Sequence, residues 1–100
     1  MSKTYRSFSR EQIAKTLDHS VLKPNATMDE ALAGAQLAKT EQVASYCIRP
    51  MDVAFASLEL TNSGVPVCTV IGFPHGTTTT ETKVFETQQA IPSGLFCQCT

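Results

Sequence analysis

The stretch from Val65 to Glu86 constrains the fold of this chain more than any other. An apolar, largely β-branched run, Val65–Ile71, stops at a turn containing Gly and Pro, Gly72–Gly76, and a helix start signal follows at once. Buried strands of parallel sheets have such apolar runs, and a parallel strand needs a crossover, usually a helix, before the next strand. The stretch therefore predicts a strand, a short turn and a crossover helix.

The same alternation occurs three times. Candidate strands begin near Leu17, Val43 and Pro66, so each unit has about 25 residues, enough for a strand, a helix and two short loops. Alternating strands and helices with short loops predict a parallel α/β sheet. Doubly wound sheets and (β/α)8 barrels share this pattern, which does not choose between them.

Four helices are predicted from their start signals. Capping boxes are expected at Ser9–Gln12, Thr27–Glu30 and Thr78–Glu81, where a hydroxyl can accept from an amide three residues later. Pro50 suits the first position of another helix, and Gly64 suits a left-handed stop after it. The apolar positions assigned to the last three helices are Ala31, Leu32, Ala35, Ala38, Val53, Ala54, Leu58, Val84, Phe85 and Ile91.

Length and charge exclude several classes of protein. One hundred residues permit one domain, and eight basic against nine acidic side chains give a formal charge of −1. No nucleic-acid or membrane partner is therefore expected. The longest apolar run is far shorter than the roughly 20 residues that span a bilayer. The N-terminus has no secretory core, and its basic, Ser-rich character leaves a transit peptide as the minor alternative.

The cysteines are interpreted as structural. Cys47 and Cys68 fall inside predicted buried strands, where we expect reduced thiols that pack as small apolar groups. Cys97 and Cys99 are too closely spaced for a typical zinc site, and neither histidine is near them in sequence. No metal site is predicted.

Asp18 is the residue most suggestive of chemistry. If it points inward, Asp18, Ser20 and Leu22 share one face of the first strand, and His19 points to the helices. A carboxylate buried there needs a partner or becomes neutral, which suits proton transfer or a water network. The alternative is a structural acid that is hydrogen-bonded to a neighbouring strand. His19 is interpreted as a packed residue between layers.

Ligands of parallel sheets gather beyond the C-terminal ends of the strands. This rule places Lys23, Cys47, Arg49 and the loop 72–76 on one rim. Arg49 either holds an anion or pairs with Asp52, and His75 is either a ligand contact or a turn residue. The loop lacks the ending of a nucleotide-binding loop, which leaves weak anion binding by its N–H groups. Cys47 is not expected to be a nucleophile, because it has no evident histidine partner.

Three blocks of the sequence resemble deoxyribose-phosphate aldolases: Leu17–Pro24, Ala44–Pro50, and Val67–Gly76 with Glu81–Glu86. The resemblance implies the N-terminal part of a (β/α)8 barrel, with about three parallel strands, four helices and no closure. It implies a cytoplasmic class I aldolase that needs no metal or other cofactor. Such an enzyme cleaves 2-deoxy-D-ribose 5-phosphate to D-glyceraldehyde 3-phosphate and acetaldehyde through a lysine Schiff base, in deoxyribonucleotide catabolism.

The resemblance also assigns site residues. Asp18 matches a supporting acid of the active-site hydrogen-bond network, and Ser20, Leu22, Cys47 and Phe73 match positions that line the substrate pocket. The family's catalytic aspartate and its two lysines belong to later strands and would lie beyond residue 100. No lysine of this chain is predicted mid-strand in a pocket, where burial would help it lose its proton. The chain alone is therefore predicted to be inactive.

The resemblance divides the chain into three segments. These are a flexible tail over residues 1–8, the strand–helix units over 9–91, and an aberrant tail over 92–100. We interpret the departure after Ile91 as a shifted reading frame, a retained intron or a faulty gene model. The alternatives to an inactive aldolase fragment are a chain that binds or interferes with the full-length enzyme, and a sugar-phosphate-binding module.

Open sheet edges predict self-association. The apolar side chains expected to be exposed on the unclosed sheet are Leu22, Ile48, Val67, Val70 and Ile71.

Overall fold

Parallel strands form the centre of the fold, as the alternating pattern predicts. The computed structural model describes residues 4–5, 7–95 and 97–99, and the side chains from 7 to 95. The elements are β1 (Thr4–Tyr5), β2 (Phe8–Ser9), α1 (Arg10–Ala14), β3 (Asp18–Val21), α2 (Met28–Glu41), β4 (Ser45–Ile48), the 3-10 turn η1 (Pro50–Asp52), α3 (Val53–Glu59), β5 (Val67–Val70), α4 (Thr80–Ala90), the 3-10 turn η2 (Ile91–Ser93) and β6 (Cys97–Cys99).

The main sheet has the order β3-β4-β5-β6, and all of its pairs are parallel. The strands β3, β4 and β5 are the three that the sequence predicts. The three-residue β6, which the sequence analysis does not predict, pairs with β5 inside the segment expected to be an aberrant tail. The order has two ends, β3 and β6, so the sheet is open and no barrel closes.

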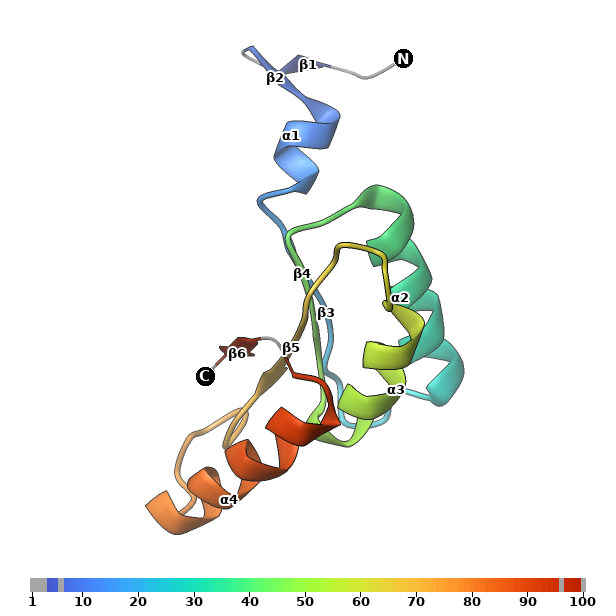
Figure 1. Ribbon diagram of the computed structural model, residues 1–100. Helices are drawn as coiled ribbons and strands as arrows, with labels where there is room; N and C mark the ends of the chain where they lie inside the picture. Colours follow the sequence, from blue (N-terminus) through green and yellow to red (C-terminus); the bar gives the residue numbers. More distant parts are fainter. Residues whose placement is uncertain (1–3, 6, 96, 100) are drawn as a thin grey trace.

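Helices α2 and α3 lie side by side along one side of this sheet, while α4 extends from the far end of β5 (Figure 1). The main core lies between α2, α3 and the sheet. Its fully buried larger side chains include Tyr46, Ile48 and Val53. The small residues Ala31, Ala35 and Ala38 of α2 face it, so the helix can approach the strands closely.

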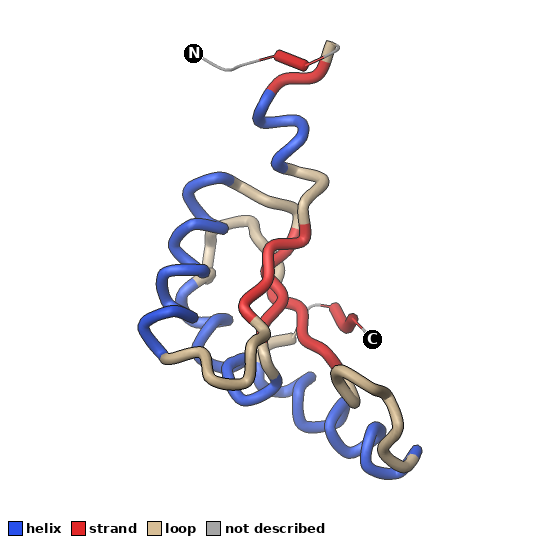
Figure 2. The backbone as a smooth tube through the Cα atoms, turned by 180° about the vertical axis from the view of Figure 1, so that it is seen from behind, coloured by secondary structure: helices blue, strands red, loops and turns tan. Residues whose placement is uncertain are grey.

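The N-terminal segment projects from the body. Strands β1 and β2 pair antiparallel, with Thr4 opposite Ser9, and α1 follows as a single short helix beyond the N-terminal end of β3 (Figures 1 and 2). The part of residues 1–8 that the structure describes thus includes backbone pairing, where the sequence predicts a flexible tail. None of the residues of α1 is buried.

The local signals at the helix starts are mostly confirmed. Both Ser9 and Thr27 accept from the amide three residues later, and Gln12 and Glu30 reach back, which completes two capping boxes. The box predicted at Thr78 is wrong by one residue: α4 begins after Thr79, whose hydroxyl accepts from Thr82 N. Four consecutive threonines offer several equivalent caps, and sequence alone does not choose among them.

The inward face predicted for α3 is wrong in part. Val53 is buried as expected, but Ala54 is exposed and Leu58 is 77% exposed. The buried positions are Val53, Ala56 and Leu60, whose spacing of three and four residues follows one side of a helix. Leu58 lies five residues after Val53, which turns it to the opposite side.

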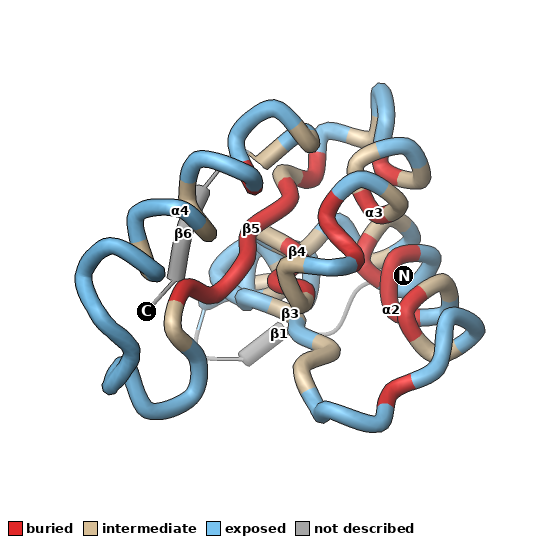
Figure 3. The backbone as a smooth tube through the Cα atoms, turned by 90° about the horizontal axis from the view of Figure 1, so that it is seen from below, coloured by how far each residue is buried: buried red, intermediate tan, exposed pale blue. Residues whose placement is uncertain are grey.

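The expected exposure of the sheet's apolar side chains is also wrong. Ile48 and Val67 belong to the core beneath α2 and α3, and Val70 lies in a second cluster with Cys47 and Cys68. Ile71 is 8% exposed. Figure 3 shows β5 buried along its length, whereas α4 is exposed over most of its turns. The exposed large apolar side chains therefore lie outside the central strands β3, β4 and β5, on helices and in the loops and turns. Along the described residues, no helix is both long and apolar enough to cross a bilayer.

Candidate functional site

The residues that the sequence singles out lie together on one face of the sheet. Ser20 of β3 is the register partner of Cys47 of β4, which is the partner of Cys68 of β5. Asp18 is the partner of Ser45 one pleat away. Because alternate residues of a strand share a face, these side chains lie opposite the face that carries Tyr46 and Ile48.

Asp18 is exposed, not buried as the sequence analysis expects. Its strand is an edge strand with an alternating exposed and half-buried pattern, so little protein covers it. Oδ1 of Asp18 accepts a 2.6 Å hydrogen bond from the Ser45 hydroxyl. The carboxylate is thus held by the neighbouring strand, as the structural alternative predicts, and it still faces solvent. The sequence analysis missed Ser45, although it lies two residues before Cys47 on the same strand.

The middle of this face is apolar and closed. Cys47 and Cys68 are 2% and 1% exposed, and they cluster with Val70 against the half-buried Leu22. Cys47 is a thiol. Cys68 is disulfide-bonded, so the expectation of a reduced thiol is wrong there. Sequence spacing gave no sign that a further strand, β6, would run beside β5. The side chains of Cys97 and Cys99 lie outside the described ones.

Phe73 lies in the loop after β5, half exposed at the C-terminal end of the strand. Helix α4 braces this loop from two sides. Glu86 Oε1 accepts from Gly72 N over 2.8 Å, and Lys83 Nζ donates to Gly76 O over 3.1 Å. Sequence analysis missed both braces, which their three-residue spacing places on one side of the helix.

Two amides of the loop are bonded within the protein itself. Gly72 N donates to the Glu86 carboxylate and Gly76 N donates to Gly72 O. Glu86 is therefore the anion at this turn, and these two N–H groups are not available to a phosphate. His75 is exposed in the same loop.

Arg49 is a structural residue, which resolves the alternatives that the sequence left open. Its Nε donates to Asp52 Oδ2 over 2.6 Å and its Nη1 donates to Pro24 O over 3.2 Å. The pair is nearly buried, with side chains 13% and 3% exposed. It ties the ends of β3 and β4 to the start of α3.

The opposite face of the sheet is a packing layer. His19 stacks on Tyr46 with ring centroids 5.7 Å apart, as expected for a histidine between layers. The Tyr46 hydroxyl donates to Ala31 O over 2.7 Å. Burial raises the pKa of Tyr46 to about 12, and the charge of Asp52 acts in the same direction while Arg49 opposes it.

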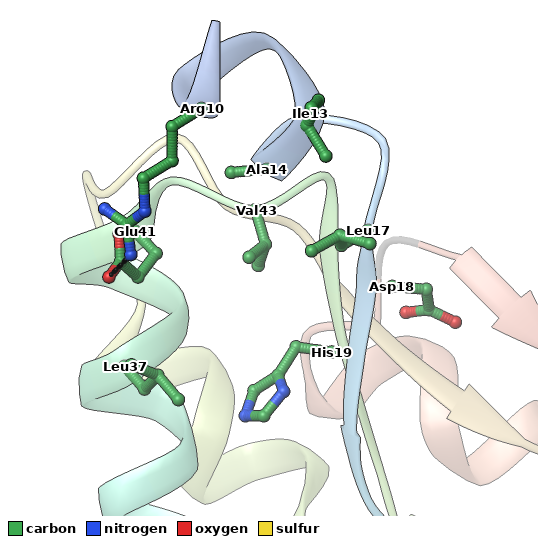
Figure 4. Close-up of a pocket in the computed structure, with 9 residues that line it drawn as sticks. All are labelled: Arg10, Ile13, Ala14, Leu17, Asp18, His19, Leu37, Glu41 and Val43. Atoms are coloured by element: carbon green, nitrogen blue, oxygen red, sulfur yellow. Dashed lines mark hydrogen bonds and ion pairs between the residues drawn. The ribbon is translucent and has the colours of Figure 1, made fainter. Parts of the chain in front are cut away.

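A cavity of about 590 Å³ lies on this packing side, beneath α1. Figure 4 shows Leu17, Leu37 and Val43 around it, with His19 at its floor. Arg10 closes one side through a 2.7 Å ion pair with Glu41. Asp18 lines the cavity only at its margin, where its carboxylate points away (Figure 4). The cavity is therefore separate from the face that carries Ser20 and Cys47.

The described lysines do not form a nucleophilic site. Lys23 is paired with Glu30 over 2.8 Å at the end of β3, and this contact, with the amide of Thr27, lowers the pKa of Glu30. Lys83 is bound to the loop carbonyl of Gly76. Lys15 is exposed after α1, and Lys39 lies on α2. Within the described residues, no group of three or more His, Cys, Asp or Glu is placed to hold a metal ion.

The sequence and the fold were compared with those of known proteins, and both resemble deoxyribose-phosphate aldolases. No protein-family profile matches the chain. Deoxyribose-phosphate aldolases from Bacillus mycoides and Bacillus cereus are each 51% identical over 82 residues, which is 82% of this chain and 37% of theirs. The chain thus spans little more than a third of the length of the curated relatives it matches.

Solved structures give the same result. A protein from Coccidioides immitis described as a deoxyribose-phosphate aldolase superposes with a TM-score of 0.87 and 33% identity, over 94% of this chain and 37% of that one. The deoxyribose phosphate aldolase of Aeropyrum pernix superposes with a TM-score of 0.84 and 28% identity, over 90% and 38%. In sequence and in fold, the chain is therefore similar to a part, about 37%, of these deoxyribose-phosphate aldolases.

Proposed function

We propose that this chain supplies one wall of the sugar-phosphate pocket of a deoxyribose-phosphate aldolase, without the amine that forms the Schiff base. The observation that carries the proposal is the common sheet face of Asp18, Ser20, Leu22 and Cys47, with Phe73 at the end of β5. The names of the relatives support it. The ligand would be a small sugar phosphate.

Each group has a role that its surroundings allow. Asp18, held by Ser45 and exposed to solvent, orients a water or a substrate hydroxyl. Ser20 adds a hydroxyl on the same face. Leu22 and Phe73 provide apolar contact that excludes water, and the buried Cys47 lies in the cluster against which Leu22 packs.

The chain alone should not catalyse carbon–carbon cleavage. A Schiff-base lysine must lose its proton near neutral pH, which requires burial or a neighbouring cation. Lys23 instead is paired with the Glu30 carboxylate, and Lys83 donates to the carbonyl of Gly76, so neither amine lies in a pocket where it could attack a substrate. The unit that carries the wall is residues 9–91, flanked by tails over 1–8 and 92–100.

The same resemblance supports a proposal for the location and the partners of the chain. A cytoplasmic location suits an enzyme of sugar-phosphate catabolism, and the formal charge of −1 argues against a nucleic-acid or membrane partner. The open edge of β3 favours self-association of the isolated chain. A free-standing phosphate-binding module is disfavoured, because Gly72 N and Gly76 N are bonded internally.

A chimera tests the pocket wall. The matched 82 residues of the Bacillus mycoides aldolase are replaced by those of this chain, and turnover of 2-deoxyribose 5-phosphate is measured. The chimera should be active, and its Asp18→Asn variant should lose at least about tenfold in kcat/KM, equivalent to roughly 1.4 kcal/mol. A folded but inactive chimera would contradict the proposal.

The isolated chain is tested separately by borohydride trapping with acetaldehyde, with the intact Bacillus mycoides enzyme as positive control. We expect no specific labelling of any lysine. Labelling of a single lysine, together with turnover by homogeneous chain, would show that the amine is present after all.

A further inference from the structure

Helix α4 holds the loop 72–76 at both of its ends. At the start of the loop, Gly72 N donates to Glu86 Oε1 over 2.8 Å. At its end, Lys83 Nζ donates to Gly76 O over 3.1 Å. Between them, Gly76 N donates to Gly72 O over 2.6 Å, which closes the turn. Two charged side chains of one helix therefore fix both ends of the loop.

The loop also lies directly on the stem of Lys83. A Cβ added at Gly72 would lie 3.1 Å from Lys83 Cδ and 3.2 Å from Lys83 Cγ, and Gly72 has a φ of +64°. Glycine tolerates this left-handed conformation and this close approach, whereas a larger residue does not. The sequence thus leaves room at Gly72 for the helix side chains to reach the loop.

Lys83 and Glu86 do not pair with each other. Residues three positions apart are neighbours on a helix surface, where a Lys and a Glu commonly form an ion pair. Among the residues that the structure describes, no ion pair joins these two. Each charge is instead directed at the backbone of the loop. This use of both side chains points to a role in setting the loop, not in stabilising the helix.

The loop presents an aromatic side chain to solvent. Phe73 is 50% exposed beyond the C-terminal end of β5, the strand next to the one that carries Cys47. A side chain on a mobile loop must be ordered when a ligand binds, which costs binding free energy. A loop that is already held avoids this cost, so the two braces would act on the affinity of a ligand that contacts Phe73.

We propose that Lys83 and Glu86 are positioning residues of the pocket wall: by fixing the loop 72–76 they hold Phe73 in place before the sugar phosphate binds. The inference rests on the proposed function for the ligand. Both side chains act through the loop, because their charged groups are bonded to it. Glu86 is the stronger brace, since its bond is shorter and part-buried, whereas that of Lys83 is exposed.

The chimera with the Bacillus mycoides aldolase, built to include residues 9–91 of this chain, tests this role through KM and kcat for 2-deoxyribose 5-phosphate. Glu86→Ala should raise KM about three- to tenfold and change kcat less than about twofold, because the loop supplies contact and no reacting group. Glu86→Gln keeps an acceptor oxygen and should stay near the parent KM. Lys83→Met keeps the stem on Gly72 but loses the donor, and should raise KM by less than Glu86→Ala.

A charge exchange separates the braces from the charge of the helix. Lys83→Glu combined with Glu86→Lys keeps the net charge and still allows an ion pair three residues apart. It leaves Gly72 N without its acceptor and Gly76 O without its donor, so KM should rise at least as much as in Glu86→Ala. Glu81→Ala is the matched control: it removes an exposed carboxylate from the same helix and should leave KM unchanged.

A double-variant cycle tests whether the braces act through Phe73. In a chimera that already carries Phe73→Ala, Glu86→Ala should raise KM by less than about twofold, because the side chain that it positions is gone. The role is overturned by additive effects of the two changes, by an unchanged KM in Glu86→Ala, or by an equal rise in Glu81→Ala. If Glu86→Ala does not fold, an unchanged KM in Lys83→Met overturns it in the same way.

These outcomes can be told apart from a failure of the proposed function. An active chimera whose KM is not changed by Glu86→Ala refutes only the positioning role. If the chimera is folded but inactive, the proposed function fails, and calorimetric titration with 2-deoxyribose 5-phosphate replaces the measurement of KM. Weaker binding in Glu86→Ala, and not in Glu86→Gln, then still supports the positioning role, whereas equal binding overturns it too.

Discussion

The Ser45 hydroxyl holds Oδ1 of Asp18 at 2.6 Å, across a register pair of β3 and β4. This contact fixes the direction of the one carboxylate on the proposed pocket wall while leaving it open to solvent. In the chimera, Ser45→Ala should reduce kcat by about tenfold, because a hydrogen bond to a charged group contributes roughly 1.5–3 kcal/mol. Ser45→Thr keeps a hydroxyl and should stay near the parent rate. Equal rates for all three would show that the contact is only structural.

The raised pKa of Tyr46 predicts a loss of stability at alkaline pH. Its pKa is raised from 10.0 to about 12 in the folded chain. Between these values only the unfolded state loses the proton, so the stabilisation is complete below pH 10 and is lost as the pH rises towards 12. The free energy of unfolding should fall by up to about 1.4 kcal/mol per pH unit there.

Urea unfolding of the parent chain and of Tyr46→Phe, below and within this window, measures the effect. Tyr46→Phe also removes the hydrogen bond to Ala31, which shifts its stability by about 1 kcal/mol at every pH. The comparison is therefore between the two pH slopes. Identical slopes would contradict the assignment to Tyr46.

The Arg49–Asp52 pair should be sensitive to removal of one partner. Both side chains are nearly buried, and Arg49 also donates to Pro24 O. Arg49→Met leaves a buried carboxylate unpaired and should cost about 3–5 kcal/mol of unfolding free energy. The double variant with Asp52→Asn should recover part of that loss. Denaturant unfolding of both single variants and the double variant measures the coupling, and strict additivity would contradict it.

Glu86 should control the order of the loop that carries Phe73. Glu86→Ala removes the acceptor of Gly72 N, so exchange of that amide should accelerate at least about tenfold. Glu86→Gln keeps an acceptor oxygen and should retain most of the protection. Gln88→Ala, on the exposed side of the same helix, is the control. Unchanged exchange in Glu86→Ala would mean that the loop is ordered by other contacts.

The features predictable from sequence are those set by local chemistry. The capping boxes at Ser9 and Thr27 depend on residues three apart, and the three strands depend on short apolar runs. The common face of Asp18, Ser20 and Cys47 follows from strand alternation once the parallel register is known.

The features that were missed depend on contacts between distant segments. The exposure of Asp18 follows from the edge position of β3, and the burial of Val70 follows from a cluster with Cys47 and Leu22. The roles of Arg49 and Glu86 depend on which loop end comes within reach. The sequence shows that Arg49 and Glu86 can form hydrogen bonds, but their partners are set by the packing of distant segments.

The small buried surface of α4 has a consequence for the thermal unfolding of this protein. The described contacts that hold α4 are the hydrogen bonds of Lys83 and Glu86 to the loop 72–76 and one buried residue, Ala90. Helix α2, in contrast, buries three alanines and Gly34. A helix held by so few buried contacts should unfold locally at a lower temperature than the rest of the chain. We therefore expect α4 to detach while the core around Tyr46 is still folded. The apolar side chains Val84 and Phe85 of α4 would then be fully accessible to other molecules. Aggregation on warming would begin at this helix, before the rest of the fold unfolds.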